Sequence, residues 1–397
     1  MTNDFDAPVD RRGTASLKWL PPPGHEHVPD VIPLWVADMD FACAPAIVEA
    51  LQKRAHHPVY GYTVRPDGYY EAFISWMARR NHWNIARSWI THAPGVVPAL
   101  NLAILAYSHP GDGIVIQPPV YYPFMAGIRN NGRRLLENPL IIRDGSYSMD
   151  FEQLEAILDN PANRAKMLIL CSPHNPVGRV WRSSELAQLA DICVARGVVI
   201  VSDEIHSDII LGSEPHICTA TAAEAAFEWT ITLTAPNKTF NIAGLQIANV
   251  VIPNPHLRAA YNAQVENLGL GLGNLFGIVA QEAAYRHGES WLDELLVYLK
   301  GSEQMVRSFL AERLPRIQAY PLEGTYLMWL YFGDLGLDDR ALREFLLTRA
   351  RIWLDEGTKF GTGGSGFMRL NIACPRARLR EALERLEAAL IDAGLAR

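Results

Sequence analysis

The feature that most limits the fold of this chain is a repeated pattern in which short, mainly apolar runs alternate with amphipathic helical stretches. The apolar runs occupy residues 113–116, 167–171, 197–201 and 229–233. Strands that are buried on both faces have this composition, because helices cover both sides of a parallel sheet. The pattern therefore predicts an α/β fold with a parallel or mostly parallel sheet.

Polar residues follow directly after three of the predicted strands. Asn175 follows the run at 167–171, Asp203 and His206 follow the run at 197–201, and Lys238 follows the run at 229–233. Ligands of such sheets bind at the carboxyl ends of the strands. We therefore predict that these four side chains converge on one crevice.

Two further features could contribute to the same crevice. A long helical pattern begins near Gly95, Val96 and Val97, where free backbone N–H groups suit an anion such as a phosphate, although most helix starts bind nothing. Tyr121 and Tyr122 follow the first apolar run. Aromatic rings at such a position can stack on a planar ligand, but they more often close a core.

Lys238 stands apart from any cluster of charge, in a loop just past a predicted buried strand. Desolvation there lowers the pKa of an amine and makes it nucleophilic, so the position suits a Schiff-base lysine. A lysine in a loop is more often a solvated surface charge, and the segment alone favours that reading. The other polar residues at the strand ends favour the functional one.

Composition excludes several function classes. The net charge of −7 gives no basic field for nucleic acid or an anionic membrane, so a small-molecule partner is expected. The five cysteines are widely spaced without a C-x-x-C pair, which predicts reduced thiols and no metal site. The N-terminus has no apolar leader, and no apolar run is long enough to span a bilayer, so we expect a cytoplasmic protein.

The length of 397 residues favours two domains. We predict an N-terminal arm with part of a small domain over residues 1–50, a large ligand-binding domain over 51–285, and an α+β small domain over 286–397. Arg369 lies in an apolar strand of this last part, where a guanidinium needs a partner: a carboxylate of the protein or of a substrate. Asp38 and Asp40 fit either an edge strand followed by a turn or a pocket wall.

Six motifs together resemble those of one enzyme family over nearly the whole chain. The chain resembles the fold-type I pyridoxal-phosphate enzymes of the aspartate aminotransferase superfamily, and within it the MalY/PatB-type cystathionine β-lyases, also called C-S lyases. The motifs are PLWVADMDF, YGYT, SPHNPVGRVW, SDEIHSDI, APNKTFNIAGLQIAN and MRLNIACPR.

The resemblance implies pyridoxal 5'-phosphate as the cofactor and assigns roles to the candidate residues. Lys238 would bind the cofactor covalently, Asp203 would pair with its pyridine nitrogen, and Asn175 would bond its phenolic oxygen. Tyr121 would stack on the ring, and Arg369 would grip the substrate carboxylate. The remaining predicted cofactor contacts are Gly95, Val96, Val97, His206, Thr234 and Tyr62.

The resemblance also implies a homodimer with shared active sites, in which Tyr62, or less well Tyr60, reaches the neighbouring subunit's phosphate. Ala37 and Tyr62 are predicted substrate contacts. Gln246 replaces the arginine that many aminotransferases carry eight residues after the lysine, and His206 replaces a tyrosine. Both replacements fit the C-S lyase branch, whereas Asn237 stands where that branch is expected to have serine.

The predicted reaction is β-elimination from cystathionine or another S-substituted cysteine, giving a thiol, pyruvate and ammonia. Lys238 is the predicted general base, and Tyr121 and Tyr122 are candidates for protonating the departing sulfur. The same residues would serve an aminotransferase, which would require a 2-oxo acid acceptor. A regulatory protein that binds the cofactor and acts through protein contact is a further alternative.

Overall fold

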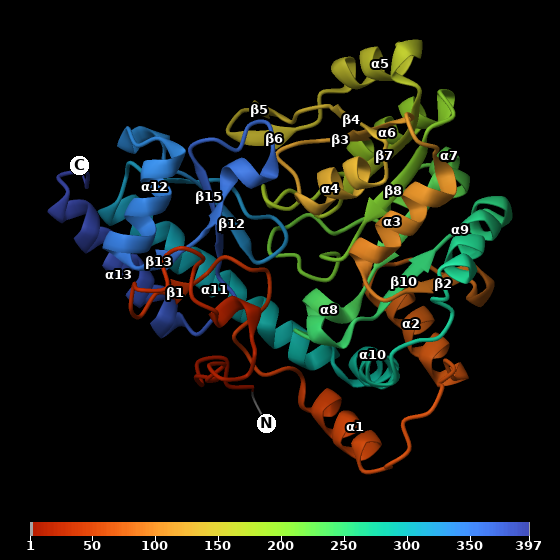
Figure 1. Cartoon of the computed structure of the whole chain (residues 1–397), viewed down its shortest axis with the longest axis horizontal. Coiled ribbons are helices and arrows are strands. Elements are labelled where there is room, and N and C mark those ends of the chain that lie inside the picture. The colour runs from red at the N-terminus through yellow and green to blue at the C-terminus, as the bar shows by residue number, and fades with distance from the viewer. Residues whose placement is uncertain (1–2, 397) are drawn as a thin grey trace.

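A seven-stranded sheet forms the centre of the computed structural model, which describes residues 3–396 (Figure 1). The strand order is β2-β10-β9-β8-β7-β3-β4, and all neighbours pair in parallel except β10, which is antiparallel to both β2 and β9. The prediction of a mostly parallel α/β sheet is confirmed. The strands are β2 (Ile90–Ala93), β3 (Gly113–Ile116), β4 (Arg134–Glu137), β7 (Ala165–Cys171), β8 (Val199–Asp203), β9 (Thr230–Thr234) and β10 (Ala248–Val251).

Helices cover both faces of this sheet, which explains why its strands lack polar alternation. Along β7, Ile169 packs into a core shared with α3 (Val96–Tyr107) and α9 (Pro255–Asn267), whereas Leu168 and Leu170 pack into a core shared with α6 (Ser183–Ala195). Successive side chains of a strand point to opposite faces, so each face needs its own apolar set. Both sets are fully buried, which fixes the register of the strands.

A second, antiparallel sheet of four strands lies in the C-terminal part of the chain. Its order is β11 (Gln318–Ala319), β12 (Leu327–Tyr331), β15 (Phe367–Asn371) and β14 (Asp355–Glu356). The helices α11 (Glu289–Arg313), α12 (Asp339–Phe345) and α13 (Arg376–Asp392) lie in the same part of the chain. Arg369 sits in the middle of β15, between β12 and β14.

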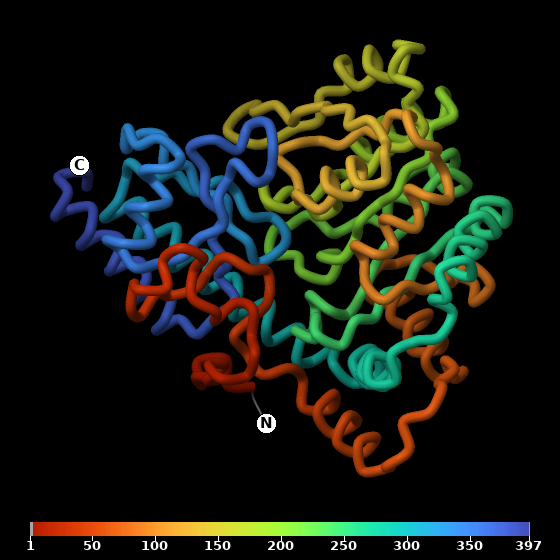
Figure 2. Tube along the Cα trace, in the orientation of Figure 1, coloured from red at the N-terminus to blue at the C-terminus, as the bar shows by residue number. Residues whose placement is uncertain are grey.

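The N-terminal segment runs beside this C-terminal part, as the red and blue traces of Figure 2 show. Strand β1 (Ile32–Pro33) pairs in parallel with β13 (Ile352–Trp353). This placement agrees with an N-terminal arm that joins the small domain, although the exact domain boundaries stay a prediction.

The remaining elements connect these layers. Among residues 3–396, no helix is both long and apolar enough to cross a membrane. The remaining helices and strands are α1 (Pro45–Ala55), α2 (Asp67–Arg80), α4 (Pro123–Asn130), β5 (Ile141–Arg143), β6 (Ser146–Ser148), α5 (Phe151–Asp159), α7 (Glu224–Trp229), α8 (Pro236–Thr239) and α10 (Leu275–His287).

Candidate active site

A pocket of about 300 Å³ opens at the carboxyl edge of the parallel strands. Its size lies at the lower end of the range typical of small-molecule sites, roughly 300–1,000 Å³. The structure brings nine of the residues singled out from the sequence to its wall, and the predicted crevice therefore exists. These residues are Ala37, Gly95, Val96, Val97, Tyr121, Asn175, Asp203, His206 and Lys238.

Lys238 lies in the short helix α8, just after β9, and its side chain is half-buried in the pocket. Its Nζ donates a hydrogen bond of 2.5 Å to the backbone carbonyl of Ala37. Burial lowers the pKa of Lys238 to about 8, with Arg369 acting in the same direction and Asp38 and Asp203 opposing it. Near neutral pH the amine is therefore close to the balance between its charged and its nucleophilic form.

Asp203 is the last residue of β8 and is buried at the floor of the same pocket. One carboxylate oxygen accepts a hydrogen bond of 3.1 Å from the backbone N–H of Ile205. Burial raises the pKa of Asp203 to about 7, against the opposing effects of this hydrogen bond and of Lys238. A cation placed against this carboxylate would restore its ionised form.

The backbone segment of residues 33–41, here called the N-terminal strap, brings Ala37 to the lysine. Asn241 adopts the left-handed conformation (φ 57°), and its side chain makes three hydrogen bonds of 2.8–3.0 Å to the backbone of Met39 and Phe41. Asn371 donates to the carbonyls of Val36 and Asp38. The strap is thus tied on one side to the loop of Lys238 and on the other to β15.

The carboxylates of Asp38 and Asp40 form a buried ion cluster behind the strap. Asp40 contacts Lys18 at 3.1 Å, Arg11 at 2.8 Å and Arg378 at 3.0 Å, and both Lys18 and Asp40 have fully buried side chains. Asp38 pairs with Arg11 and lies 3.6 Å from Lys18. The sequence left open whether Asp38 and Asp40 belong to a pocket wall. The strap lines the pocket through Ala37, whereas the carboxylates of Asp38 and Asp40 hold the strap in place.

Arg369 lies beside the pocket, with its guanidinium buried against Asn175. Its Nη1 donates to Asn175 Oδ1 at 2.9 Å, and its Nη2 donates to the Trp35 carbonyl and to Asp355 Oδ2, both at 2.8 Å. The protein carboxylate that the sequence left open as a partner is therefore Asp355. The amide nitrogen of Asn175 is not used in these bonds.

Several groups of the pocket wall are available to hydrogen-bonding or anionic groups of a ligand. Helix α3 starts at Val96 with Gly95 before it, and the first N–H groups of a helix have no partner within it. A Cβ added at Gly95 would meet no atom closer than 3.5 Å, so protein packing does not require glycine there. Two buried atoms of pocket residues, Asn237 Oδ1 and His206 Nδ1, have no hydrogen-bond partner.

Besides Arg369, three predicted site residues lie outside the pocket wall. Tyr122 packs against Tyr121 and Phe360, with ring centroids 5.4 and 5.6 Å apart. Thr234 is buried at the end of β9. Tyr62 is 97% exposed and lines a separate hollow together with Leu272 and Gly273.

Sequence reasoning assigned no role to Asn241 or Asp355. Asp355 could have been proposed as a candidate, because an arginine inside an apolar strand needs a buried carboxylate, and Asp355 directly follows the apolar run at residues 352–354. No sequence signal shows that Asn241 is bonded to residues two hundred positions away. Cys171, another pocket residue that was not singled out, accepts a hydrogen bond from the Asn175 N–H.

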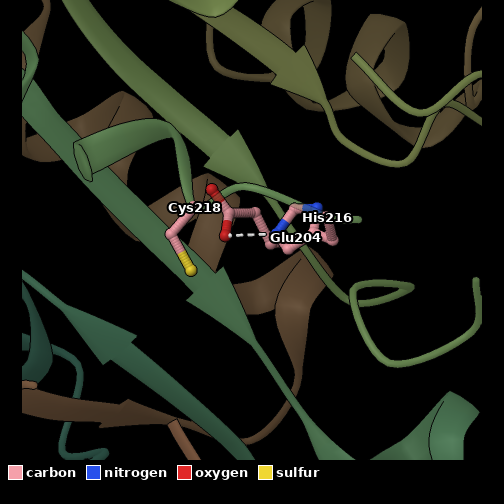
Figure 3. Close-up of side chains that lie close together, drawn as sticks. All are labelled: Glu204, His216 and Cys218. Carbon is pink, nitrogen blue, oxygen red and sulfur yellow. Dashed lines mark hydrogen bonds and ion pairs between the residues drawn. The ribbon is translucent and has the colours of Figure 1, made fainter. Parts of the chain in front are cut away.

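One group of metal-ligand side chains gathers next to Asp203 in the described part of the chain (Figure 3). The ligand atoms of Glu204, His216 and Cys218 lie within 4.8 Å of one another. Glu204 already accepts hydrogen bonds from His216 Nε2 at 3.0 Å and from the Thr219 N–H at 2.9 Å. These buried hydrogen bonds hold Glu204, the residue directly after Asp203, in place.

A mixed seven-stranded sheet with a lysine, an aspartate and an asparagine at its carboxyl edge defines the aminotransferase-like class of fold-type I proteins. The family model "Aminotransferase class I and II" matches residues 29–386, and the chain belongs to this family.

Relatives within the family match the chain over nearly its whole length. Cystathionine beta-lyase PatB of Bacillus subtilis is 43% identical over 98% of this chain and 100% of that protein. Protein MalY of Escherichia coli is 34% identical, covering 95% and 96%. The crystal structure of cystalysin from Treponema denticola, described as containing a pyridoxal 5'-phosphate cofactor, superimposes with a TM-score of 0.95 at 39% identity and covers 99% of this chain and 100% of that one.

Proposed function

We propose that this protein is a pyridoxal-phosphate-dependent carbon-sulfur β-lyase that cleaves cystathionine or a related S-substituted cysteine. The observation that carries the proposal is the pocket in which the amine of Lys238, with its lowered pKa, is placed together with the buried carboxylate of Asp203. The full-length likeness to the cystathionine β-lyase PatB supports the same reaction.

The residues present fit this cofactor. Lys238 would bind it covalently, Asp203 would face its ring nitrogen, and the free amide nitrogen of Asn175 would donate to its phenolic oxygen. The helix start at Gly95–Val97 would hold the phosphate, and Tyr121 would cover the ring. The unpaired Asn237 Oδ1 and His206 Nδ1 support a polar ligand in the pocket.

When bound, pyridoxal phosphate supplies an electron sink for the pair of electrons released at the substrate's Cα. Arg369 would bind the substrate carboxylate and so orient the Cα–H bond toward Lys238. The neutral amine of Lys238 would then take the Cα proton. Burial lowers the pKa of His206 to about 3, so its imidazole stays neutral and adds no positive charge beside the lysine.

The carbon-sulfur bond then breaks, with the electron pair leaving on sulfur. Burial raises the pKa of both Tyr121 and Tyr122, so each phenol still carries its proton when the sulfur departs. Tyr121 lines the pocket, and Tyr122 packs against its ring. We propose one of these tyrosines as the acid for the leaving group.

The active form is proposed to be a homodimer in which Tyr62 reaches the neighbouring subunit's pocket. Tyr62 is 97% exposed in a segment without regular structure. Three apolar side chains are exposed as well: Val64 of the same segment, and Leu268 and Leu272 of the loop that adjoins it. An apolar group of this kind favours burial against another chain. Mutation of Tyr62 to alanine should therefore weaken cofactor binding even though the residue lies outside its own pocket.

The test is turnover of cystathionine and, separately, of S-alkylcysteines by the purified holoenzyme, with pyruvate and free thiol followed together. Both products should appear in equal amounts without any added 2-oxo acid. Turnover that requires a 2-oxo acid acceptor would instead establish an aminotransferase, the activity suggested by the description of a 43% identical protein from Clostridium difficile as a putative aminotransferase.

A further inference from the structure

The guanidinium of Arg369 donates three hydrogen bonds to protein partners, and one of these partners is an anion. Its side chain is 2% exposed, as is expected of an arginine with several buried acceptors. Asp355 faces Arg369 directly, because the two residues pair across the antiparallel strands β14 and β15. The carboxylate of Asp355 is itself buried, with a side-chain exposure of 1%.

The number of donors on the guanidinium limits how a second carboxylate can bind. An arginine offers five N–H bonds, two on each Nη and one on Nε. Both N–H bonds of Nη2 are used, by the Trp35 carbonyl and by Asp355, and one of Nη1 is used by Asn175. The Nε–H is buried without a partner.

A carboxylate that binds an arginine through two parallel hydrogen bonds needs either both Nη atoms or Nη2 together with Nε. Both arrangements use Nη2, whose two N–H bonds are already donated to Trp35 and Asp355, so one of these two hydrogen bonds must break first. The Trp35 carbonyl belongs to the N-terminal strap, whose position is fixed by Asn371, whereas the Asp355 bond depends on one side chain. Asp355 is therefore the partner that an incoming carboxylate displaces.

We infer that Asp355 sets the affinity of the active site for the substrate carboxylate by competing for Arg369. This inference rests on the proposed function in that Arg369 receives a carboxylate. Lys359 supports the competition, because its Nζ lies 3.1 Å from Asp355 Oδ1 and offers the carboxylate an alternative partner when Arg369 is taken. Asp355 thus acts through Arg369 as a positioning residue and keeps the carboxylate site from holding its ligand too tightly.

If Asp355 competes for Arg369, then Asp355→Asn should strengthen, not weaken, the binding of carboxylates. The amide keeps the shape of the side chain but removes the competing charge, so carboxylates should bind about tenfold more tightly, which corresponds to ~1.4 kcal/mol. KM for the amino-acid substrate should fall by a similar factor. The kcat should fall as well if product release becomes limiting, because pyruvate is also a carboxylate.

The experiment is calorimetric titration of the holoenzyme with 3-(methylthio)propionate, a thioether carboxylate that lacks the α-amino group and cannot react. Glu356→Gln is the matched control: it removes a neighbouring carboxylate that also contacts Lys359, at 3.4 Å, but has no bond to Arg369. Tighter binding in Asp355→Asn alone supports the inference. Equal or weaker binding in Asp355→Asn, or the same gain in both variants, would overturn it.

A second variant keeps the test decisive if Asp355→Asn does not fold. Lys359→Met removes the alternative partner of Asp355 from a half-exposed position, so Asp355 should hold Arg369 more firmly and carboxylate binding should weaken. Unchanged binding in Lys359→Met would contradict the inference. Because the titration needs no turnover, it separates this inference from the proposed lyase activity, which is tested by product formation in the unmodified enzyme.

Discussion

Replacing Asn241 should separate the contribution of its hydrogen bonds from that of its backbone conformation. The side chain makes three hydrogen bonds to the N-terminal strap. At about 1 kcal/mol each, their loss in Asn241→Gly should lower the free energy of unfolding by about 3 kcal/mol. In Asn241→Ala the positive φ of 57° adds a further cost of roughly 1 kcal/mol, because a Cβ is unfavourable there.

Thermal unfolding followed by circular dichroism would measure both variants. The unfolding entropy expected for a chain of 397 residues converts these energies into decreases in Tm of roughly 4 °C for glycine and roughly 5 °C for alanine. The strap also presents the Ala37 carbonyl to Lys238, so both variants should lose activity by at least about tenfold. Variants with unchanged Tm, or an alanine variant more stable than the glycine variant, would refute this reasoning.

Three further predictions concern the titratable groups. The kcat should rise with pH and level off above about 8, the pKa of Lys238, because only the neutral amine takes a proton; a pH-independent kcat between 6 and 9 would exclude this role. Asp203→Asn should keep the fold but lose about 10²-fold or more in kcat, measured as pyruvate release, and near-normal turnover would contradict its pairing with the cofactor. Asp40→Asn should lower the free energy of unfolding by roughly 3–5 kcal/mol, measured by urea unfolding, because the buried Lys18 loses the negative charge that compensates its own. The pKa of Asp40 is lowered in the folded state, so the stabilisation by Asp40 should be present above about pH 4 and be lost as the pH falls. A variant as stable as the parent protein would show that the ion cluster is dispensable.

The sequence was sufficient to predict the sheet and the position of the pocket, because both follow from local patterns. Continuous apolar runs required two covered faces, and the polar residues after them had to lie at one edge of the sheet. Asn175, Asp203 and Lys238 were found in this way. Their roles toward the cofactor were implied by the family resemblance and stay predictions for the experiments above.

The parts that could not be predicted depend on contacts between distant segments. The carbonyl of Ala37 meets Lys238 only because Asn241 and Asn371 hold the strap from two sides, and no periodicity encodes such bonds. The choice of Asp355 as the partner of Arg369 depended on the register of β14 and β15. Tyr62 illustrates the same limit between chains, because its proposed role requires a neighbouring subunit.

The most direct test of the account is to locate the lysine that binds the cofactor. The holoenzyme would be reduced with borohydride, which fixes the cofactor to its lysine through a stable carbon-nitrogen bond, then digested and examined by mass spectrometry. The account predicts one phosphopyridoxyl group per chain, on the peptide that carries Lys238, and none at this position in Lys238→Ala. A label on another lysine, or a fully loaded protein without any label, would contradict it.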